Sequence, residues 1–78
     1  MSEKPVKTLD CRGLSCPMPI MKTKKEIEKI SIGQILEIWS SDAGSKEDFP
    51  RWAKRTGNEL IKMEEKEGYT IFYIKKKS

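Results

Sequence analysis

The chain is 78 residues long, and apolar and charged side chains each make up 36% of it. A chain of this length forms one domain, residues 1–78, and folding buries only about 60% of the surface that the unfolded chain exposes. A large enzyme with a closed substrate cavity is therefore excluded. No apolar run approaches the roughly 20 residues of a membrane helix, and the N-terminal residues lack the hydrophobic segment of a secretory signal. We expect a cytoplasmic protein with no membrane partner.

The charge and the cysteine content narrow the chemistry further. Sixteen basic against 12 acidic residues give a net charge of +4, which suits an acidic partner but is also typical of a surface that only keeps a small domain soluble. There is no histidine, which excludes Cys–His and Ser–His catalysis. The only cysteines, Cys11 and Cys16, cannot complete a four-ligand zinc site and do not have the C-x-x-C spacing. We expect no metal and no cofactor, and any chemistry to depend on a thiol.

Strand and helix patterns alternate along the first part of the chain. Val6, Thr8 and Leu9 predict a strand over Pro5–Asp10. The apolar period then becomes helical from Pro17 to about Ile30, with Gly33 near the C-terminal end of this helix.

The second part continues the alternation and ends in two strands. A strand over Gln34–Ser40 is followed by a helix that ends at Thr56. Ser45 or Asp48 could cap this helix, and Pro50 requires a start close to Asp48, because a proline inside a helix would lose a hydrogen bond. Phe49, Trp52, Ala53 and Thr56 should face inward. The final strands, Leu60–Lys66 and Tyr69–Lys75, should form a hairpin.

The order βαβαββ predicts an α+β protein, a two-layer α/β sandwich with the sheet covered by helices on one face only. On the strand Gln34–Ser40, Leu36 and Ile38 share the covered face. The other face of the sheet should be at least partly wet, with four partly exposed side chains: Ile35, Trp39, Ile71 and Tyr73.

The most informative stretch surrounds Cys16, which is followed by Pro17, Met18 and Pro19. Proline favours the first turn of a helix, so we expect Pro17 as the first helical residue and Cys16 at the N-terminal cap. Free backbone N–H groups and the helix dipole there would stabilise a thiolate, or a persulfide anion, over the neutral form. Cys16 is therefore the candidate catalytic nucleophile on a rigid helix start.

Residues close to Cys16 have supporting roles in this hypothesis. Arg12 would add positive charge if the loop brings it near the thiol, and Gly13 supplies a backbone angle that other residues resist. Met18 falls near the polar side of the helix, where it would contact a partner protein or pack locally.

The pattern Leu9-Asp10-x-x-Gly13-Leu14-x-Cys16-Pro17-x-Pro19 resembles that of the TusA/SirA-like small sulfur-carrier family. The resemblance covers nearly the whole chain. It implies a mixed four-stranded sheet whose last strand is antiparallel to the others. It also implies that Cys16 carries a persulfide as a sulfurtransferase-type carrier, and that Asp10 and Gly13 shape the loop. From the residues themselves we expect Arg12, Pro17 and Pro19 to support the loop and the helix start. The implied donor is a cysteine desulfurase or a rhodanese-type protein, and the implied acceptor serves tRNA thiolation, cofactor assembly or sulfur metabolism.

Two alternatives to a one-cysteine carrier follow from the residues. Cys11 is not part of the pattern, and it is either a small residue at a strand end or a second thiol that resolves an oxidised or persulfidated Cys16 in a dithiol redox protein. The basic residues would form a nucleic-acid-binding surface on the two helices, although acidic residues interrupt it, so nucleic acid is the less favoured partner. The basic positions are Lys22, Lys25, Lys29, Arg51, Lys54 and Arg55.

Overall fold

The computed structural model describes residues 4–15 and 17–77. Its elements follow the predicted order βαβαββ. They are β1 (Pro5–Cys11), α1 (Met18–Ile27), β2 (Ile35–Ser40), α2 (Ser45–Thr56), β3 (Glu59–Lys66) and β4 (Tyr69–Lys75). Within the described residues, neither helix is long and apolar enough to span a bilayer.

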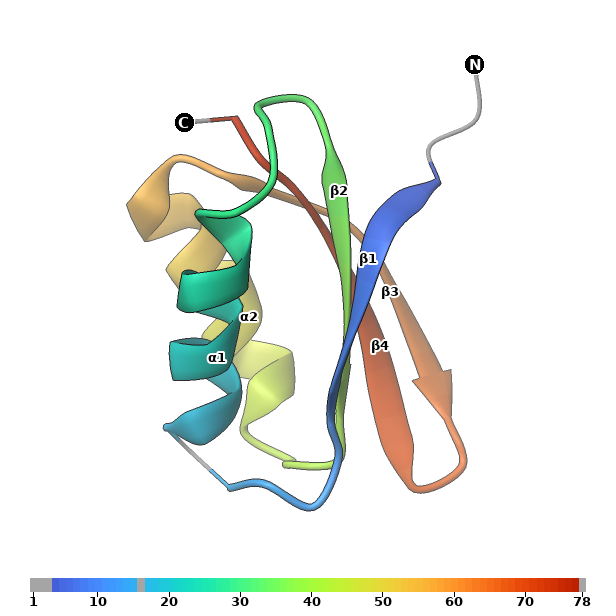
Figure 1. The fold of residues 1–78 in the computed structure, drawn as a ribbon. Coiled ribbons are helices and arrows are strands. Elements are labelled where there is room, and N and C mark those ends of the chain that lie inside the picture. The colour runs from blue at the N-terminus through green and yellow to red at the C-terminus, as the bar shows by residue number, and fades with distance from the viewer. Residues whose placement is uncertain (1–3, 16, 78) are drawn as a thin grey trace.

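The strands form one four-stranded sheet in the order β1-β2-β4-β3. β1 is parallel to β2, and β4 is antiparallel to both β2 and β3, so the expected mixed sheet with an antiparallel last strand is confirmed. Both helices lie on the same face of the sheet, which confirms the two-layer sandwich (Figure 1). Since β1, β2 and β3 run in the same direction, their carboxyl ends meet at one end of the sheet. The β1–α1 loop, the β2–α2 loop and the β3–β4 turn lie together there, at the bottom of Figure 1.

The core lies between the sheet and the helices because strand side chains alternate between the two faces. Leu36 and Ile38 of β2 are fully buried there, as predicted, together with Phe72 and Ile74 of β4. The rings of Phe49 on α2 and Phe72 lie 4.6 Å apart between their centroids, so this aromatic pair joins the two layers.

The face of the sheet away from the helices, called here the open face, is less exposed to solvent than predicted. Trp39 and Tyr73 are half-buried, as expected, but Ile35 and Ile71 are only 3% and 5% exposed. The register places Ile71 between Trp39 and Glu64 on the neighbouring strands. Long side chains on adjacent strands cover a smaller residue between them, which periodicity along one strand does not reveal.

The first helix is shorter than predicted. α1 ends at Ile27 instead of about Ile30, and its C-cap is Glu28 in the right-handed helical conformation. Gly33 does not cap the helix. It lies in the following loop with φ of +94°, and its N–H donates to the carbonyl of Lys76 at 2.7 Å. The glycine is thus used for a turn beside the C-terminal segment.

The second helix begins earlier than predicted, at Ser45, so that Pro50 lies inside it. A buried hydrogen bond of 2.7 Å between the hydroxyls of Ser40 and Ser45 fixes the start of α2 to the end of β2. The N–H of Asp48 donates to the carbonyl of Gly44 at 2.9 Å, so a full turn forms before the proline. At the other end Thr56 is exposed, contrary to expectation, while Phe49, Trp52 and Ala53 are buried as predicted.

Candidate functional site at the β1–α1 loop

The loop between β1 and α1 is held by hydrogen bonds on both sides of Cys16, which itself lies outside the described residues. Before it, the N–H of Leu14 donates to the carbonyl of Cys11 at 3.2 Å, and after it the N–H of Met18 donates to the carbonyl of Ser15 at 2.9 Å. Gly13 has a φ of +84°, which confirms the predicted need for glycine. Its N–H donates to the Ser41 hydroxyl at 2.8 Å, which ties this loop to the β2–α2 loop.

The start of α1 differs by one residue from the prediction. The helix begins at Met18, and Pro17 is its N-cap residue, with φ of −99° and ψ of 14°. The carbonyl of Pro17 accepts a hydrogen bond from the N–H of Met21 at 3.0 Å, and Pro19 lies buried in the first turn. Both prolines are therefore accommodated without breaking the helix.

The expected set of free N–H groups at this helix start is reduced. Pro17 and Pro19 have no N–H, and the N–H of Met18 is occupied by Ser15. None of these three described residues therefore offers an N–H group to an anion. The positive end of the α1 dipole still favours a negative charge at this helix start.

Arg12 is bound to Asp10 and to two aromatic rings. Its guanidinium donates to both carboxylate oxygens of Asp10, at 3.0 and 2.9 Å, and its backbone N–H donates to the same carboxylate at 3.1 Å. The guanidinium also lies 4.7 Å from the ring centre of Trp39 and 5.1 Å from that of Tyr69. The side-chain and then the backbone hydrogen bonds from Arg12 lower the pKa of Asp10, and the bond to Asp10 raises that of Arg12. The pair anchors the loop to the open face.

Cys11 lies in the core, apart from the Asp10–Arg12 pair. Its side chain is fully buried among the residues that join the two layers. Burial is the largest influence and raises the pKa of its thiol; the charge of Lys22 lowers this pKa by less, and the charge of Asp10 raises it by less still. A buried, protonated thiol is a poor nucleophile. The geometry therefore favours Cys11 as a small core residue and weighs against a dithiol pair with Cys16.

Two methionines make the surface beside the helix start apolar. Met18 is 41% exposed, as its helical phase predicted, and Met21 is 50% exposed. Exposed, flexible thioethers adapt to varied protein surfaces. This is the type of surface that suits contact with a partner.

Sequence reasoning missed three residues that hold the loop: Ser41, Trp39 and Tyr69. The sequence places Trp39 and Tyr69 on the open face of the sheet, with Tyr69 at the start of the last strand, but it does not place either ring beside Arg12. The available signal was their place in the strands: Trp39 stands near the end of β2, which is parallel to β1, and Tyr69 begins β4, which is antiparallel to β2, so both lie at the end of the sheet where β1 ends. Among residues 4–15 and 17–77 no group of three or more Asp, Glu, Cys or His side chains is arranged to hold a metal ion.

Comparison with known proteins gives one family and one fold. The sequence profile described as "Sulfurtransferase TusA" matches residues 7–76. The chain is 47% identical over 68 residues to the "Sulfur carrier protein TusA" of Allochromatium vinosum, covering 87% of this chain and 90% of that protein. It is 41% identical over 70 residues to the "Putative sulfur carrier protein YrkI" of Bacillus subtilis, covering 90% and 93% of the two chains.

A longer relative and a crystal structure extend this comparison. A "Putative sulfur carrier protein" of Aquifex aeolicus is 47% identical over 72 residues, which cover 92% of this chain but only 36% of that protein. The crystal structure of a SirA-like protein from Desulfitobacterium hafniense superposes with a TM-score of 0.80 at 20% identity, covering 94% of this chain and all of that one. At this identity the likeness concerns the fold alone.

Proposed function

Because the chain belongs to the TusA sulfurtransferase family, we propose that it is a sulfur carrier and that Cys16 holds the sulfur as a persulfide. The Cys16 thiolate attacks the terminal sulfur of a persulfide on the donor protein. The sulfur–sulfur bond of the donor breaks, the donor cysteine leaves as a thiolate, and Cys16 becomes a persulfide anion. Delivery to the acceptor is the same exchange in reverse, with the Cys16 thiolate as the leaving group, so no external oxidant or reductant is needed.

The observation that carries this proposal is the position of the Cys-Pro-x-Pro segment at the junction of β1 and α1. The flanking residues Ser15 and Pro17 are both exposed, and the axis of α1 starts immediately after them. The positive end of the helix dipole favours an anionic sulfur over a neutral one. We expect a thiol between these two exposed residues to be accessible to another protein without a substrate pocket.

The neighbouring residues have supporting roles in the proposal. Asp10 and Arg12 hold the end of β1 to the open face, and Gly13 provides the turn. Pro17 and Pro19 stiffen the start of α1. Met18, exposed beside them, contacts the partner.

The partners follow from the same chemistry. The donor is a protein that makes a cysteine persulfide, of the cysteine desulfurase or rhodanese type. The acceptor is a protein of tRNA thiolation, cofactor assembly or sulfur metabolism with its own reactive thiol.

The test is direct loading of the sulfur. The purified chain is incubated with a cysteine desulfurase and L-cysteine, and its intact mass is measured before and after a reductant. We expect a gain of one sulfur that the reductant removes. Cys16→Ala should abolish this gain, while the matched variant Cys11→Ala should still acquire it. Loading of Cys16→Ala to the wild-type extent, or no reductant-sensitive sulfur on the wild-type chain, would overturn the proposal.

A further inference from the structure

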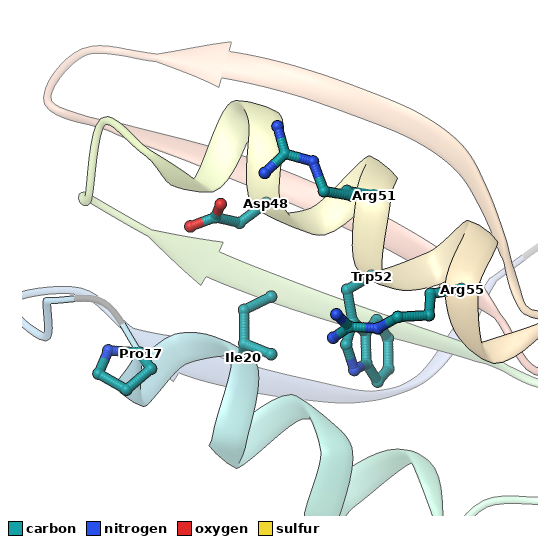
Figure 2. A pocket seen from close by; sticks show the side chains of 6 residues that line it. All are labelled: Pro17, Ile20, Asp48, Arg51, Trp52 and Arg55. Carbon is teal, nitrogen blue, oxygen red and sulfur yellow. The ribbon is translucent and has the colours of Figure 1, made fainter.

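A hollow lies between the two helices beside the proposed sulfur site. It has a volume of about 210 Å³ and is lined by residues from the start of α1 and the middle of α2. Figure 2 shows Pro17 and Ile20 on the α1 side, with the α2 side formed by Asp48, Arg51, Trp52 and Arg55. Pro17 is bonded directly to Cys16. Any group held in the hollow is therefore close to the sulfur-bearing loop.

The two arginines of the hollow differ from Arg12 in their pairing. Arg12 is bound to a carboxylate and two rings, whereas within residues 4–15 and 17–77 neither Arg51 nor Arg55 has a hydrogen-bond or ion-pair partner. Asp48 contributes one negative charge to the same wall, so the hollow carries one excess positive charge. Guanidinium groups pair most strongly with carboxylates, through two parallel hydrogen bonds. The hollow is thus arranged to accept an anionic group.

The distribution of charge over the chain points in the same direction. Residues 18–30 and 45–56, which we call the helix layer, contain eight basic and four acidic residues. The rest of the chain carries eight of each. The whole net charge of +4 therefore belongs to the helix layer, which is the layer that contains the hollow. This field favours the approach of an acidic protein surface.

The shape of the hollow distinguishes a side chain from a free ion. Its floor is apolar, since Trp52 is only 4% exposed and Ile20 is half-buried against the core. A glutamate side chain would lay its methylene stem on this floor and direct its carboxylate to the arginines. A small inorganic anion would pair with the arginines but leave the apolar floor uncovered.

From these observations we propose that the hollow is a docking site for a carboxylate side chain of the sulfur donor protein, bound by Arg51 and Arg55. This rests on the proposed function, because it takes Cys16 to be the sulfur acceptor from that donor. The carboxylate fixes the orientation of the donor so that its persulfide faces Cys16. Arg51 and Arg55 are accordingly positioning residues that contact the partner and not the sulfur.

The test compares two ways of loading the same chain. One arm uses a cysteine desulfurase with L-cysteine, and the other uses inorganic polysulfide, which needs no docking. We expect R51Q/R55Q to load about 100-fold more slowly from the desulfurase, about tenfold for each lost charge pair. Loading from polysulfide should be unchanged. The matched control is Lys54→Gln, which removes an exposed charge of the same helix outside the hollow. It weakens only the general field of the helix layer, so it should lower the desulfurase rate by about twofold at most and leave the polysulfide rate as in the wild type.

Each other outcome has a defined meaning. Wild-type loading of R51Q/R55Q by the desulfurase would overturn the docking proposal, and so would an equal loss in both arms, because that would place the effect on Cys16 itself. Saturable binding of sulfate at the arginines without any change in desulfurase loading would also overturn it, in favour of a small-anion site. If the wild-type chain accepts sulfur in neither arm, the proposed function fails and not only the docking site.

Discussion

The helix layer and the open face of the sheet differ in how their charged side chains are paired. On the open face, Arg12 is bound by Asp10, and Glu64 lies within 4 Å of two lysines, at 2.7 and 3.8 Å. In the helix layer, six basic residues have no hydrogen-bond or ion-pair partner among residues 4–15 and 17–77. They are Lys22, Lys24, Lys25, Arg51, Lys54 and Arg55.

From this difference we infer that paired charges mainly stabilise the fold, while unpaired cations mainly serve binding. Charges that are satisfied internally hold loops and strand ends in place but offer little to a partner. Cations left in water contribute little to folding and are available for an incoming acidic group. The helix layer, which also contains the start of α1, is therefore the face on which we expect partners to bind.

The variant with the largest expected effect, Phe49→Ala, tests whether packing against the core holds the helix layer in place. Phe49→Ala removes the ring that packs on Phe72 and should lower the free energy of unfolding by about 3–5 kcal/mol. Urea unfolding monitored by circular dichroism measures this loss. Met63→Ala, at an exposed apolar position of the sheet, is the control and should change it by about 0.5 kcal/mol or less. Equal losses would mean that this aromatic pair does not join the layers.

A second experiment concerns Cys11, which lies beneath the helix layer. Cys11→Ser places a hydroxyl where burial is complete and should lower the free energy of unfolding by about 1–3 kcal/mol. Cys11→Ala should cost less, because it buries no polar group. A serine variant as stable as the wild type would contradict the burial of Cys11.

Because the pKa of the Cys11 thiol is raised by burial, we also expect the stability of the fold to depend on pH in the alkaline range. The pKa of this thiol is raised in the folded state, so above the ordinary thiol pKa the unfolded chain loses this proton before the folded chain does. Stability should therefore fall as the pH rises through that range, and the fall should be smaller in Cys11→Ala. Thermal unfolding at a series of alkaline pH values measures the difference. An identical alkaline profile for the two proteins would contradict it.

A smaller effect separates a paired arginine from an unpaired one. Arg12→Leu breaks the contacts with Asp10, Trp39 and Tyr69 and should lower Tm by a few degrees. Arg55→Gln, in the hollow, should leave Tm unchanged because its guanidinium has no partner in the described part of the chain. Scanning calorimetry of the two variants makes the comparison. An equal shift in both would remove the distinction between the two faces.

The smallest effect is the acid response of Asp10. Its pKa is lowered by the hydrogen bonds from Arg12, so its contribution to stability is present above the ordinary aspartate pKa of about 3.9 and is lost as the pH falls through the lowered value. Asp10→Asn should lose stability at neutral pH and show a correspondingly shallower decline in acid. Urea midpoints between neutral and strongly acidic pH measure this. A decline as steep as that of the wild type would assign the acid response to other carboxylates.

The parts of the fold that follow from short segments could be predicted. Alternation in β2 located Leu36 and Ile38 in the core, and Gly68 marked the hairpin, which has a two-residue turn in the register. Helix limits were less predictable because they depend on contacts outside the helix. The hydroxyl pair of Ser40 and Ser45 moved the start of α2 ahead of Pro50, against the local preference of proline.

The candidate site also has features that could be predicted from the sequence and features that could not. The Cys-Pro-x-Pro segment is contiguous, so local helix rules could predict that its prolines stand at a helix start, although α1 begins one residue later than predicted. The partners of Arg12 could not be predicted, because Trp39 and Tyr69 come from other strands and reach it only through the sheet order. The burial of Cys11 likewise depends on the helices that cover the end of β1.

The sequence by itself determined the small size, the alternation of helices and strands, the placement of Cys16 before a proline-stiffened helix, and the net charge of +4. The tertiary structure decided which charges are paired and where the excess lies. Backbone preferences act over a few neighbouring residues, so they are encoded locally. Charge pairing depends on strand register and helix packing, which bring distant residues within a few ångströms and leave Arg51 and Arg55 without a partner in the described part of the chain, beside the proposed sulfur site.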